Sequence, residues 1–252
     1  AIIYSDWGQG QACSCSEVCV IDIFMRRENI EDIVRDENAL KSHIESLLCN
    51  RQRRLIPKDN LRESAVLIPV CFEDGHPWVI VTKRSMTVEH HRGEISFPGG
   101  RAEPGDKDLV FTALREAEEE IGLKKDDVEV LGLLDDHISI LGYHITPVVG
   151  AIPSPYRFTI NSESEVLLRV SLISALKDTV WMAEKTTFMG RDINIYYLEI
   201  DGGILWGASA RMFKHFVDLI AGRTVCYGPV SPKAKAWVRE LLGRQAGHAS
   251  GR

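Results

Sequence analysis

The feature that most constrains the fold is a glycine-rich loop at residues 99–106 that leads into an acidic helix ending near residue 123. The helical part carries Glu116, Glu119 and Glu120. Side chains three and four positions apart share one face of a helix. We therefore predict a helix that brings three carboxylates to one face, an arrangement that core packing alone does not require.

The three carboxylates favour a cation site. Like charges on one helix face destabilise the helix by a few tenths of a kcal/mol per pair, so a cation should compensate. Mg²⁺ or Mn²⁺ takes oxygen ligands and keeps positions for water and substrate phosphates, which favours phosphate chemistry. The alternative is a solvated acidic face, as most charge runs are. Arg115, four residues before Glu119, and Gly122, at the expected helix end, favour the catalytic interpretation.

These residues resemble the Nudix hydrolase box, G-x5-E-x7-R-E-U-x-E-E-x-G-U, where U is aliphatic. From Arg115 to Leu123 the match is complete if Ala117 counts as U. The front half departs from the pattern. Counting from Gly100, Asp106 stands where the first Glu belongs, and eight residues instead of seven separate it from Arg115.

The periodicity predicts an α+β fold, and the resemblance implies the Nudix α/β/α sandwich with a mixed β-sheet. Predicted helices besides the box helix span residues 37–48 and 208–221. Predicted strands span residues 65–72, 78–82, 93–98, 128–134, 144–152, 166–170 and 193–198, the first two as a hairpin and the third delivering a Gly99-Gly100 turn. We expect an N-terminal extension at 1–36, a Nudix hydrolase domain at 37–225 and a C-terminal helix or tail at 226–252.

Upstream of the box, residues 80–100 resemble the signature of the coenzyme A pyrophosphatase branch, L-L-T-x-R-S/A-x3-R-x3-G-x3-F-P-G-G. Arg84, Ser85, Gly93 and residues 97–100 fall in register. The resemblance extends over about residues 40–225.

One position reverses the charge of that signature. Glu89 stands where the second Arg is expected, and Arg92 or Lys83 could supply the missing charge.

The resemblance implies magnesium- or manganese-dependent hydrolysis of the diphosphate bond of coenzyme A or acyl-CoA, giving 3′,5′-ADP and 4′-phosphopantetheine or its acyl form. The glutamates Glu116, Glu119 and Glu120, with a backbone carbonyl of Gly99 or Gly100, would hold the metal, and Arg115 would orient Glu119. The general base stays open between a box glutamate and Glu165. The substrate-binding candidates are Arg84, Ser85, Arg92, Gly99 and Gly100.

Composition limits the partners. A formal net charge of −6 argues against general binding to nucleic acid or an anionic membrane. No apolar run approaches the roughly 18 residues of a membrane span, and we expect a cytoplasmic protein. Residue 1 is Ala, which we interpret as part of an extension, a processed end or a remnant of cloning.

Three functions remain open from the sequence. The first is hydrolysis of coenzyme A, and the second is hydrolysis of another nucleoside diphosphate derivative, such as ADP-ribose or a damaged nucleotide. The third is a Nudix-fold ligand-binding module without turnover, which would not need the intact Arg115, Glu116, Glu119 and Glu120 set. The expected partner is a small nucleoside diphosphate derivative of the coenzyme A class, with a homodimer as one admissible assembly.

Overall fold

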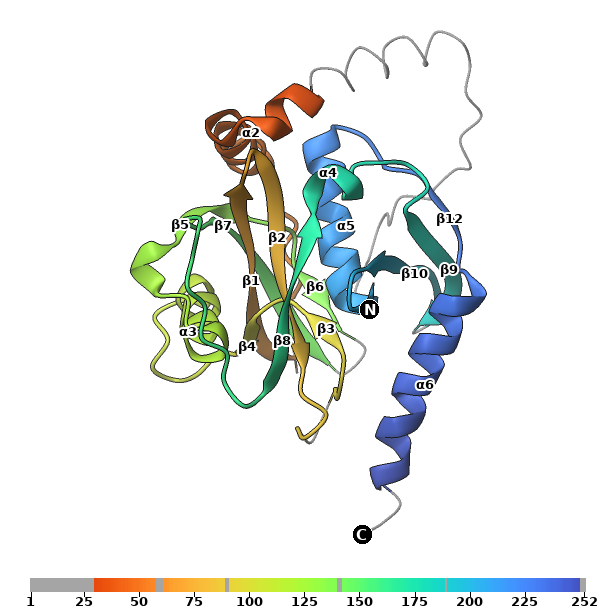
Figure 1. Cartoon of the computed structure of the whole chain (residues 1–252). Coiled ribbons are helices and arrows are strands. Elements are labelled where there is room, and N and C mark those ends of the chain that lie inside the picture. Colours follow the sequence, from red (N-terminus) through yellow and green to blue (C-terminus); the bar gives the residue numbers. More distant parts are fainter. Residues whose placement is uncertain (1–29, 58–60, 89–90, 140–141, 189, 250–252) are drawn as a thin grey trace, which may run out of the picture.

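The computed structural model describes residues 30–57, 61–88, 91–139, 142–188 and 190–249 (Figure 1). Most of the expected extension, 1–36, and the departing residue Glu89 lie outside the described residues. The helices are α2 (Glu37–Cys49), α3 (Leu109–Ile121), α4 (Leu172–Ala175), α5 (Gly207–Ala221) and α6 (Pro232–Ala249), with a 3₁₀ turn η1 (Lys125–Asp127). The strands are β1 (Arg62–Glu73), β2 (His76–Arg84), β3 (Ile95–Ser96), β4 (Gly99–Arg101), β5 (Glu129–Leu133), β6 (His137–Ile138), β7 (Tyr143–Ala151), β8 (Ser164–Ser171), β9 (Trp181–Phe188), β10 (Arg191–Ile200), β11 (Gly203–Trp206) and β12 (Tyr227–Pro229).

The larger sheet is mixed. Its main path runs β3-β2-β1-β7-β5, with β4, β6 and β8 pairing alongside. β1 and β7 are parallel, whereas β1 and β2 form the predicted antiparallel hairpin through a turn at Asp74 and Gly75, both with positive φ. The predicted mixed sheet is confirmed.

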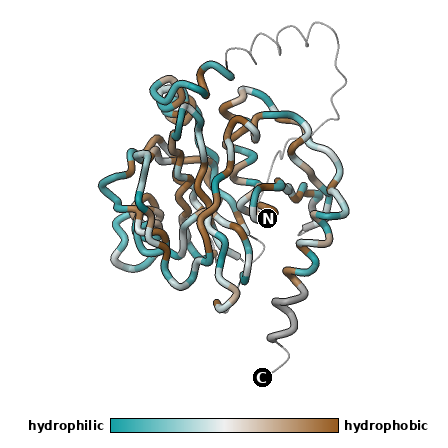
Figure 2. The backbone as a smooth tube through the Cα atoms, viewed as in Figure 1, coloured by the Kyte–Doolittle hydropathy of each residue, from teal (hydrophilic) through white to brown (hydrophobic). Residues whose placement is uncertain are grey.

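Side chains along β1 alternate between two buried clusters, and these clusters show which helices cover each face of the sheet. Ala65 and Leu67 belong to one buried cluster with Ala113 and Ala117 of α3. Ile68 belongs to a second cluster, together with buried residues of α2 and α5. Successive side chains of a strand point to opposite faces, so the sheet lies between α3 on one side and α2 and α5 on the other. The apolar segments of Figure 2 concentrate in these central strands. This is the predicted α/β/α sandwich.

A second sheet, in the order β11-β10-β9-β12, lies on the far side of α5 (Figure 1). Phe213 of α5 joins the two sheets, because its ring lies 6.1 Å from that of Phe97 and 5.7 Å from that of Trp181. The sequence predicted α5 and β10 but missed β9, β11 and β12. No helix in the described part of the chain is long and apolar enough to cross a membrane.

The predicted turn at Gly99-Gly100 is wrong. These glycines open strand β4, which pairs with β1 so that Gly99 faces Val66 and Gly100 faces Ala65. A Cβ at Gly99 would lie 2.6 Å from the Cα of Val66, too close for any side chain. The glycine is therefore needed for strand-to-strand approach, which the sequence pattern did not separate from a turn.

Candidate active site

Helix α3 is fixed at both ends and along one side. The side chain of Asp108 accepts a hydrogen bond from the backbone N–H of Phe111 at 2.7 Å, and Gly122 ends the helix in the left-handed conformation with φ 67°. Ala113 and Ala117 are fully buried against the sheet. These contacts set the direction in which the glutamates leave the helix.

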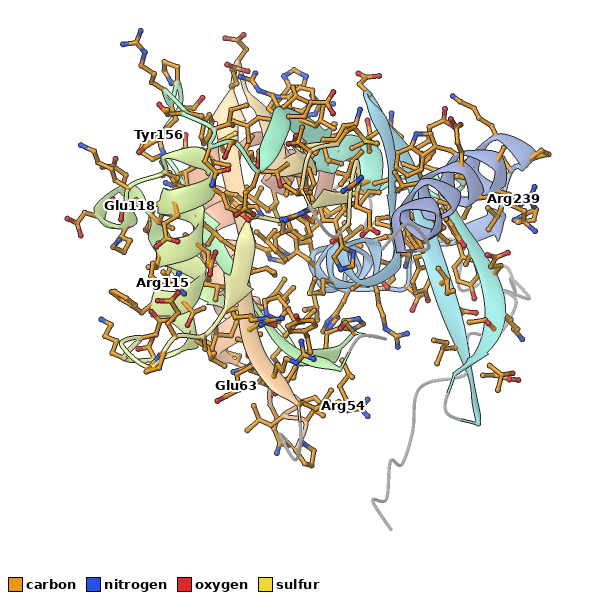
Figure 3. The ribbon with its side chains drawn as sticks, turned by 90° about the horizontal axis from the view of Figure 1, so that it is seen from below. Arg54, Glu63, Arg115, Glu118, Tyr156 and Arg239 are labelled. Carbon is orange, nitrogen blue, oxygen red and sulfur yellow. The ribbon has the colours of Figure 1, made fainter. Side chains whose placement is uncertain are left out.

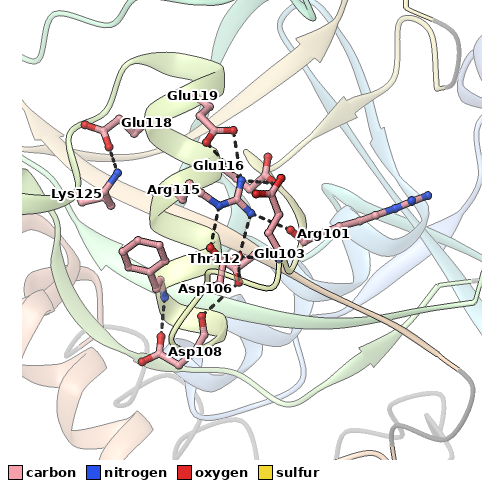
Figure 4. A network of polar contacts seen from close by, with 11 residues as sticks. Arg101, Glu103, Asp106, Asp108, Thr112, Arg115, Glu116, Glu118, Glu119 and Lys125 are labelled. Carbon is pink, nitrogen blue, oxygen red and sulfur yellow. Dashed lines mark hydrogen bonds and ion pairs between the residues drawn. The ribbon is translucent and has the colours of Figure 1, made fainter.

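Arg115 is the centre of a polar network (Figure 4). Its guanidinium donates to both carboxylate oxygens of Asp106, from Nε to Oδ1 at 2.9 Å and from Nη2 to Oδ2 at 3.0 Å. Nη2 also donates to the backbone carbonyl of Arg101 at 2.9 Å. Nη1 lies 3.0 Å from Glu116 Oε1 and 3.3 Å from Glu119 Oε2, so the predicted contact between Arg115 and Glu119 is present.

Asp106 therefore reaches Arg115 despite its shorter side chain and the extra residue in the loop. Hydrogen bonds from Arg115 hold the pKa of the Asp106 carboxyl well below its usual range. Thr112 adds a hydroxyl donor at 2.8 Å. The carboxylate anchors the guanidinium that contacts two of the box glutamates.

Glu120 lies in a different environment from its neighbours on the helix. Its side chain is 9% exposed, and it accepts a hydrogen bond from the backbone N–H of Gly99 at 3.2 Å. Nη1 of Arg84 lies 3.8 Å from Glu120 Oε1. Burial raises the pKa of Glu120 to about 7 in spite of these two partners. The carboxyl is thus poised to lose its proton near neutral pH.

The absence of a side chain at Gly100 leaves the space that the carboxylate of Glu116 occupies. A Cβ at position 100 would lie 2.4 Å from the carboxyl carbon of Glu116, so any side chain would displace this group. The carboxylate therefore rests against the backbone of β4, and burial raises its pKa. This is the close backbone approach for which the sequence needed glycine.

The three carboxylates are divided between two arginines. Glu116 and Glu119 contact Arg115, whereas Glu120 turns toward Gly99 and Arg84. Among the described side chains, no three or more carboxylates, histidines or cysteines already form a cation cage. The donor set nevertheless fits Mg²⁺ or Mn²⁺, because all donors are hard oxygens and two carboxyls have pKa values raised by burial, which a divalent cation would reverse.

Glu163 is the site residue that the sequence analysis missed. Its Oε2 accepts from Nη2 of Arg84 at 3.2 Å, and its charge helps to raise the pKa of Glu120. Its backbone carbonyl accepts from the N–H of Ser85 at 2.7 Å. The signal was the pair of glutamates at 163 and 165, but the sequence did not reveal that β8 begins between them, at Ser164.

Several predicted residues lie apart from the carboxylates. Glu165 lies on β8 with its side chain 47% exposed, and its carboxylate is 3.8 Å from Nζ of Lys83 on β2. Arg92 donates to the carbonyl of Val88 within its own loop, and the hydroxyl of Ser85 bonds that of Thr87 at 2.7 Å. Their assigned roles stay predictions.

Comparison with known proteins decides the family. The model of the NUDIX domain matches residues 61–185. An uncharacterized Nudix hydrolase, NudL, from Yersinia pestis (strain Pestoides F) is 34% identical over 161 residues, which are 64% of this chain and 80% of that protein. The chain belongs to the Nudix hydrolase family.

The Nudix assignment makes the chain a pyrophosphohydrolase of a family that generally uses divalent metal ions. Solved structures that match part of the chain include an Ap4A hydrolase from C. elegans, with 17% identity and a TM-score of 0.40 over 45% of this chain and 83% of that chain. Another is RenU, a Nudix hydrolase from M. smegmatis, with 22% identity and a TM-score of 0.39 over 45% and 72%.

Proposed function

We propose that this Nudix hydrolase cleaves the diphosphate bond of coenzyme A or acyl-CoA, giving 3′,5′-ADP and 4′-phosphopantetheine or its acyl form. The observation that carries the proposal is the position of Arg84. This arginine belongs to the coenzyme A signature, and its guanidinium lies between Glu120 of the box and Glu163. A signature residue and the hydrolase box therefore share one site.

Arg84 is suited to bind the diphosphate. Its planar fork matches phosphate oxygens, and its Nε is buried without an acceptor among the described residues. Glu116, Glu119 and Glu120 would hold Mg²⁺ or Mn²⁺, with the backbone of Gly100 close by. When bound, the divalent ion polarises a phosphoryl oxygen and lowers the pKa of water.

We favour Glu163 as the general base. It is 55% exposed and is held 3.2 Å from Arg84, so a water beside a diphosphate on Arg84 is within its reach. Glu165 and the box glutamates stay the alternatives. Arg115, anchored by Asp106, would hold Glu116 and Glu119 in place as a positioning residue.

Another nucleoside diphosphate derivative, such as ADP-ribose, is the second candidate. Glu89 replaces the second arginine of the coenzyme A signature, and a carboxylate there would repel a phosphate.

A substrate panel tests the proposal. Coenzyme A, ADP-ribose and nucleoside triphosphates are incubated separately with the protein and Mg²⁺, and the products are identified by mass spectrometry. We expect coenzyme A to be cleaved fastest, with 3′,5′-ADP and 4′-phosphopantetheine as products. Faster cleavage of ADP-ribose, with coenzyme A left intact, would replace the first candidate with the second. A Glu120→Gln preparation controls for contaminating phosphatases.

A further inference from the structure

Helix α6 packs on the second sheet through one face and continues beyond it. Ala234 and Val238 are buried in a cluster with residues of β10 and β11. Side chains three and four positions apart share a face of a helix, so Leu241 points to the same side as these two, about one turn further along. Leu241 is also buried, with 7% of its surface exposed, whereas its neighbour Leu242 is 44% exposed. The inner face of α6 therefore has a further contact beyond the sheet.

That contact is with the segment between β2 and β3. A Cβ on Gly93 would lie 3.0 Å from Cδ1 of Leu241 and 3.0 Å from Sδ of Met86. Gly93 also has φ 68°, a conformation that other residues rarely adopt. The side chain of Leu241 thus rests on the backbone of Gly93, beside Met86.

One turn earlier, Trp237 makes the same kind of contact with β11. A Cβ on Gly203 would lie 3.0 Å from Cζ2 of Trp237 and 2.8 Å from Cδ1 of Ile95. Helix α6 therefore runs from β11 to the residues that enter β3, touching first Gly203 and then Gly93. The two contacts together fix the helix against the start of β3.

Gly93 is hydrogen-bonded to the arginine on which the proposed function depends. The N–H of Gly93 donates to the carbonyl of Arg84 at 3.1 Å, and the N–H of Arg84 donates to the carbonyl of Glu94 at 2.8 Å. The side chain of Arg84 then reaches Glu120 and Glu163. A shift of the Gly93 backbone would therefore move the backbone of Arg84, and with it the guanidinium beside the two carboxylates.

Helix α6 itself lies away from the carboxylate site. In Figure 3, Arg239 of α6 and Arg115 of α3 lie on opposite sides of the molecule. The residues matched by the NUDIX domain model end at 185, so α6 lies outside them. An influence of α6 on the site must pass through the residues in between, and the contact of Leu241 with Gly93 provides such a path to Arg84.

We propose that Leu241 is a positioning residue for the substrate site, because it holds Gly93 and, through it, the backbone of Arg84. The proposal rests on the proposed role of Arg84 as a residue that binds the diphosphate. Leucine offers no polar atom, so its effect comes from packing: a filled space beside Gly93 leaves the guanidinium few alternative positions. A binding group that is ordered in advance loses less conformational entropy when the ligand binds. The C-terminal helix is then part of substrate recognition.

Hydrogen exchange tests the contact without any substrate. The wild type is compared with Leu241→Ala and with the matched control Leu242→Ala, which shortens the exposed neighbour on the same helix. In Leu241→Ala we expect the amides of Gly93 and Arg84 to exchange at least about fivefold faster, because local opening depends on the packing that covers a segment. Amides of α3 are the internal reference and should be unchanged in both variants. Unchanged exchange at Gly93 and Arg84, or an equal increase in α3, overturns the proposal.

A double-mutant cycle tests whether Leu241 acts through Arg84. We expect Leu241→Ala to raise KM about threefold with kcat within about twofold, because a binding contact remote from the reacting bond affects ground and transition states alike. In the Arg84→Ala background the same substitution should leave KM unchanged, since residues that act as one unit are not additive. An equal rise of KM in both backgrounds, or a fall of kcat with KM unchanged, overturns the proposal.

A conservative variant separates packing from misfolding. Leu241→Met keeps nearly the same apolar volume, so KM and the exchange of Gly93 should stay within about twofold of the wild type. If Leu241→Met behaved like Leu241→Ala, the filled space beside Gly93 would not be the cause, and the proposal would be rejected. Should Leu241→Ala not fold by circular dichroism, Leu241→Val replaces it in both experiments, with smaller effects in the same direction.

The proposed substrate and the proposed role of Leu241 fail in different ways. The kinetics use whichever diphosphate compound the substrate panel shows to be cleaved, so cleavage of ADP-ribose in place of coenzyme A rejects the substrate and leaves the cycle intact. A raised KM in Arg84→Ala with an unchanged KM in Leu241→Ala rejects only the role of Leu241. An unchanged KM in Arg84→Ala rejects both the role of Arg84 and that of Leu241.

Discussion

The carboxylate site on α3 and a cavity of about 250 Å³ beside α5 differ in the balance of their charges. On α3, carboxylates outnumber the two arginines that contact them, and Glu120 keeps a raised pKa because burial outweighs its partners. Beside α5, three aspartates line the cavity with two arginines and one lysine, and burial is the main cause that lowers the pKa values of Arg211 and His137. An acidic excess favours binding of a cation, whereas a balanced set of charges favours neither sign. The acidic excess on α3 supports the proposed metal site there.

The largest expected effect is the loss of activity when a carboxylate of the α3 site is removed. Glu120→Gln keeps a hydrogen-bond acceptor for Gly99 but removes the charge that would bind the metal. With Mg²⁺ present, kcat should therefore fall by roughly two or more orders of magnitude. We expect the same loss for Glu119→Gln. Steady-state kinetics at saturating Mg²⁺ measure this. Glu118→Gln is the matched control, since Glu118 pairs with Lys125, and its kcat should stay within about twofold. Turnover near that of wild type in both site variants would remove the metal assignment.

The next largest effect tests the anchor of Arg115. Asp106→Asn removes the charged partner of the guanidinium, and we expect kcat to fall by roughly 10-fold, as for loss of a group that orients a metal ligand. The free energy of unfolding should fall by about 1–3 kcal/mol, because a charge-assisted pair is lost. Denaturant unfolding and kinetics on the same preparation measure both. A variant with full activity would mean that Arg115 needs no anchor.

A smaller effect is expected for Arg84. Arg84→Ala should raise KM for coenzyme A about fivefold, or roughly 1 kcal/mol, with less change in kcat, because a contact remote from the reacting bond stabilises ground and transition states alike. The effect is limited because the guanidinium of Arg84 also stays paired with Glu163 and so is shared between the two groups. An unchanged KM would show that the signature upstream of the box does not contact substrate here.

The last effect concerns the stability of the metal-free protein, and no change in turnover is expected from it. Glu120 has a pKa of about 7 in the folded protein against 4.5 for an unperturbed glutamate, so the folded protein binds more protons than the unfolded chain between these values. Stability should therefore fall as pH rises from about 4.5 to 7, by on the order of 2–3 kcal/mol, and then level off. Glu120→Gln should lack this loss, and Mg²⁺ should restore stability in the wild type. Thermal unfolding of the wild type and of Glu120→Gln at several pH values measures this. If the stability of the two proteins changed with pH in the same way, the raised pKa would not belong to Glu120.

The same contrast explains what the sequence could predict. Glu116, Glu119 and Glu120 lie within about one turn of a single helix, so their spacing in the sequence was enough to predict that they share a face. Asp106 was found as a departure from a pattern, but only the structure shows that its carboxylate still reaches Arg115. Contacts such as that of Glu163 with Arg84 depend on where a strand begins and which edge it pairs with. The sequence carries no local signal for them.

The cavity was beyond prediction for a related reason. Its arginines and histidines stand at positions 54, 137, 211 and 215, in segments that meet only once α5 packs between the two sheets. None of these residues belongs to a local motif. Helix and strand periodicity predicted α5, but not the sheet formed by β9 to β12 behind it.

Binding of Mn²⁺ tests the central claim most directly, namely that the carboxylates of α3 form the cation site of this Nudix hydrolase. Electron paramagnetic resonance counts free Mn²⁺ during titration of the wild type, of Glu116→Gln/Glu120→Gln and of Arg211→Lys. The account predicts that the first variant binds Mn²⁺ at least about 10-fold more weakly, since it loses two ligands, and that Arg211→Lys binds like the wild type. Unchanged Mn²⁺ affinity in Glu116→Gln/Glu120→Gln would contradict it.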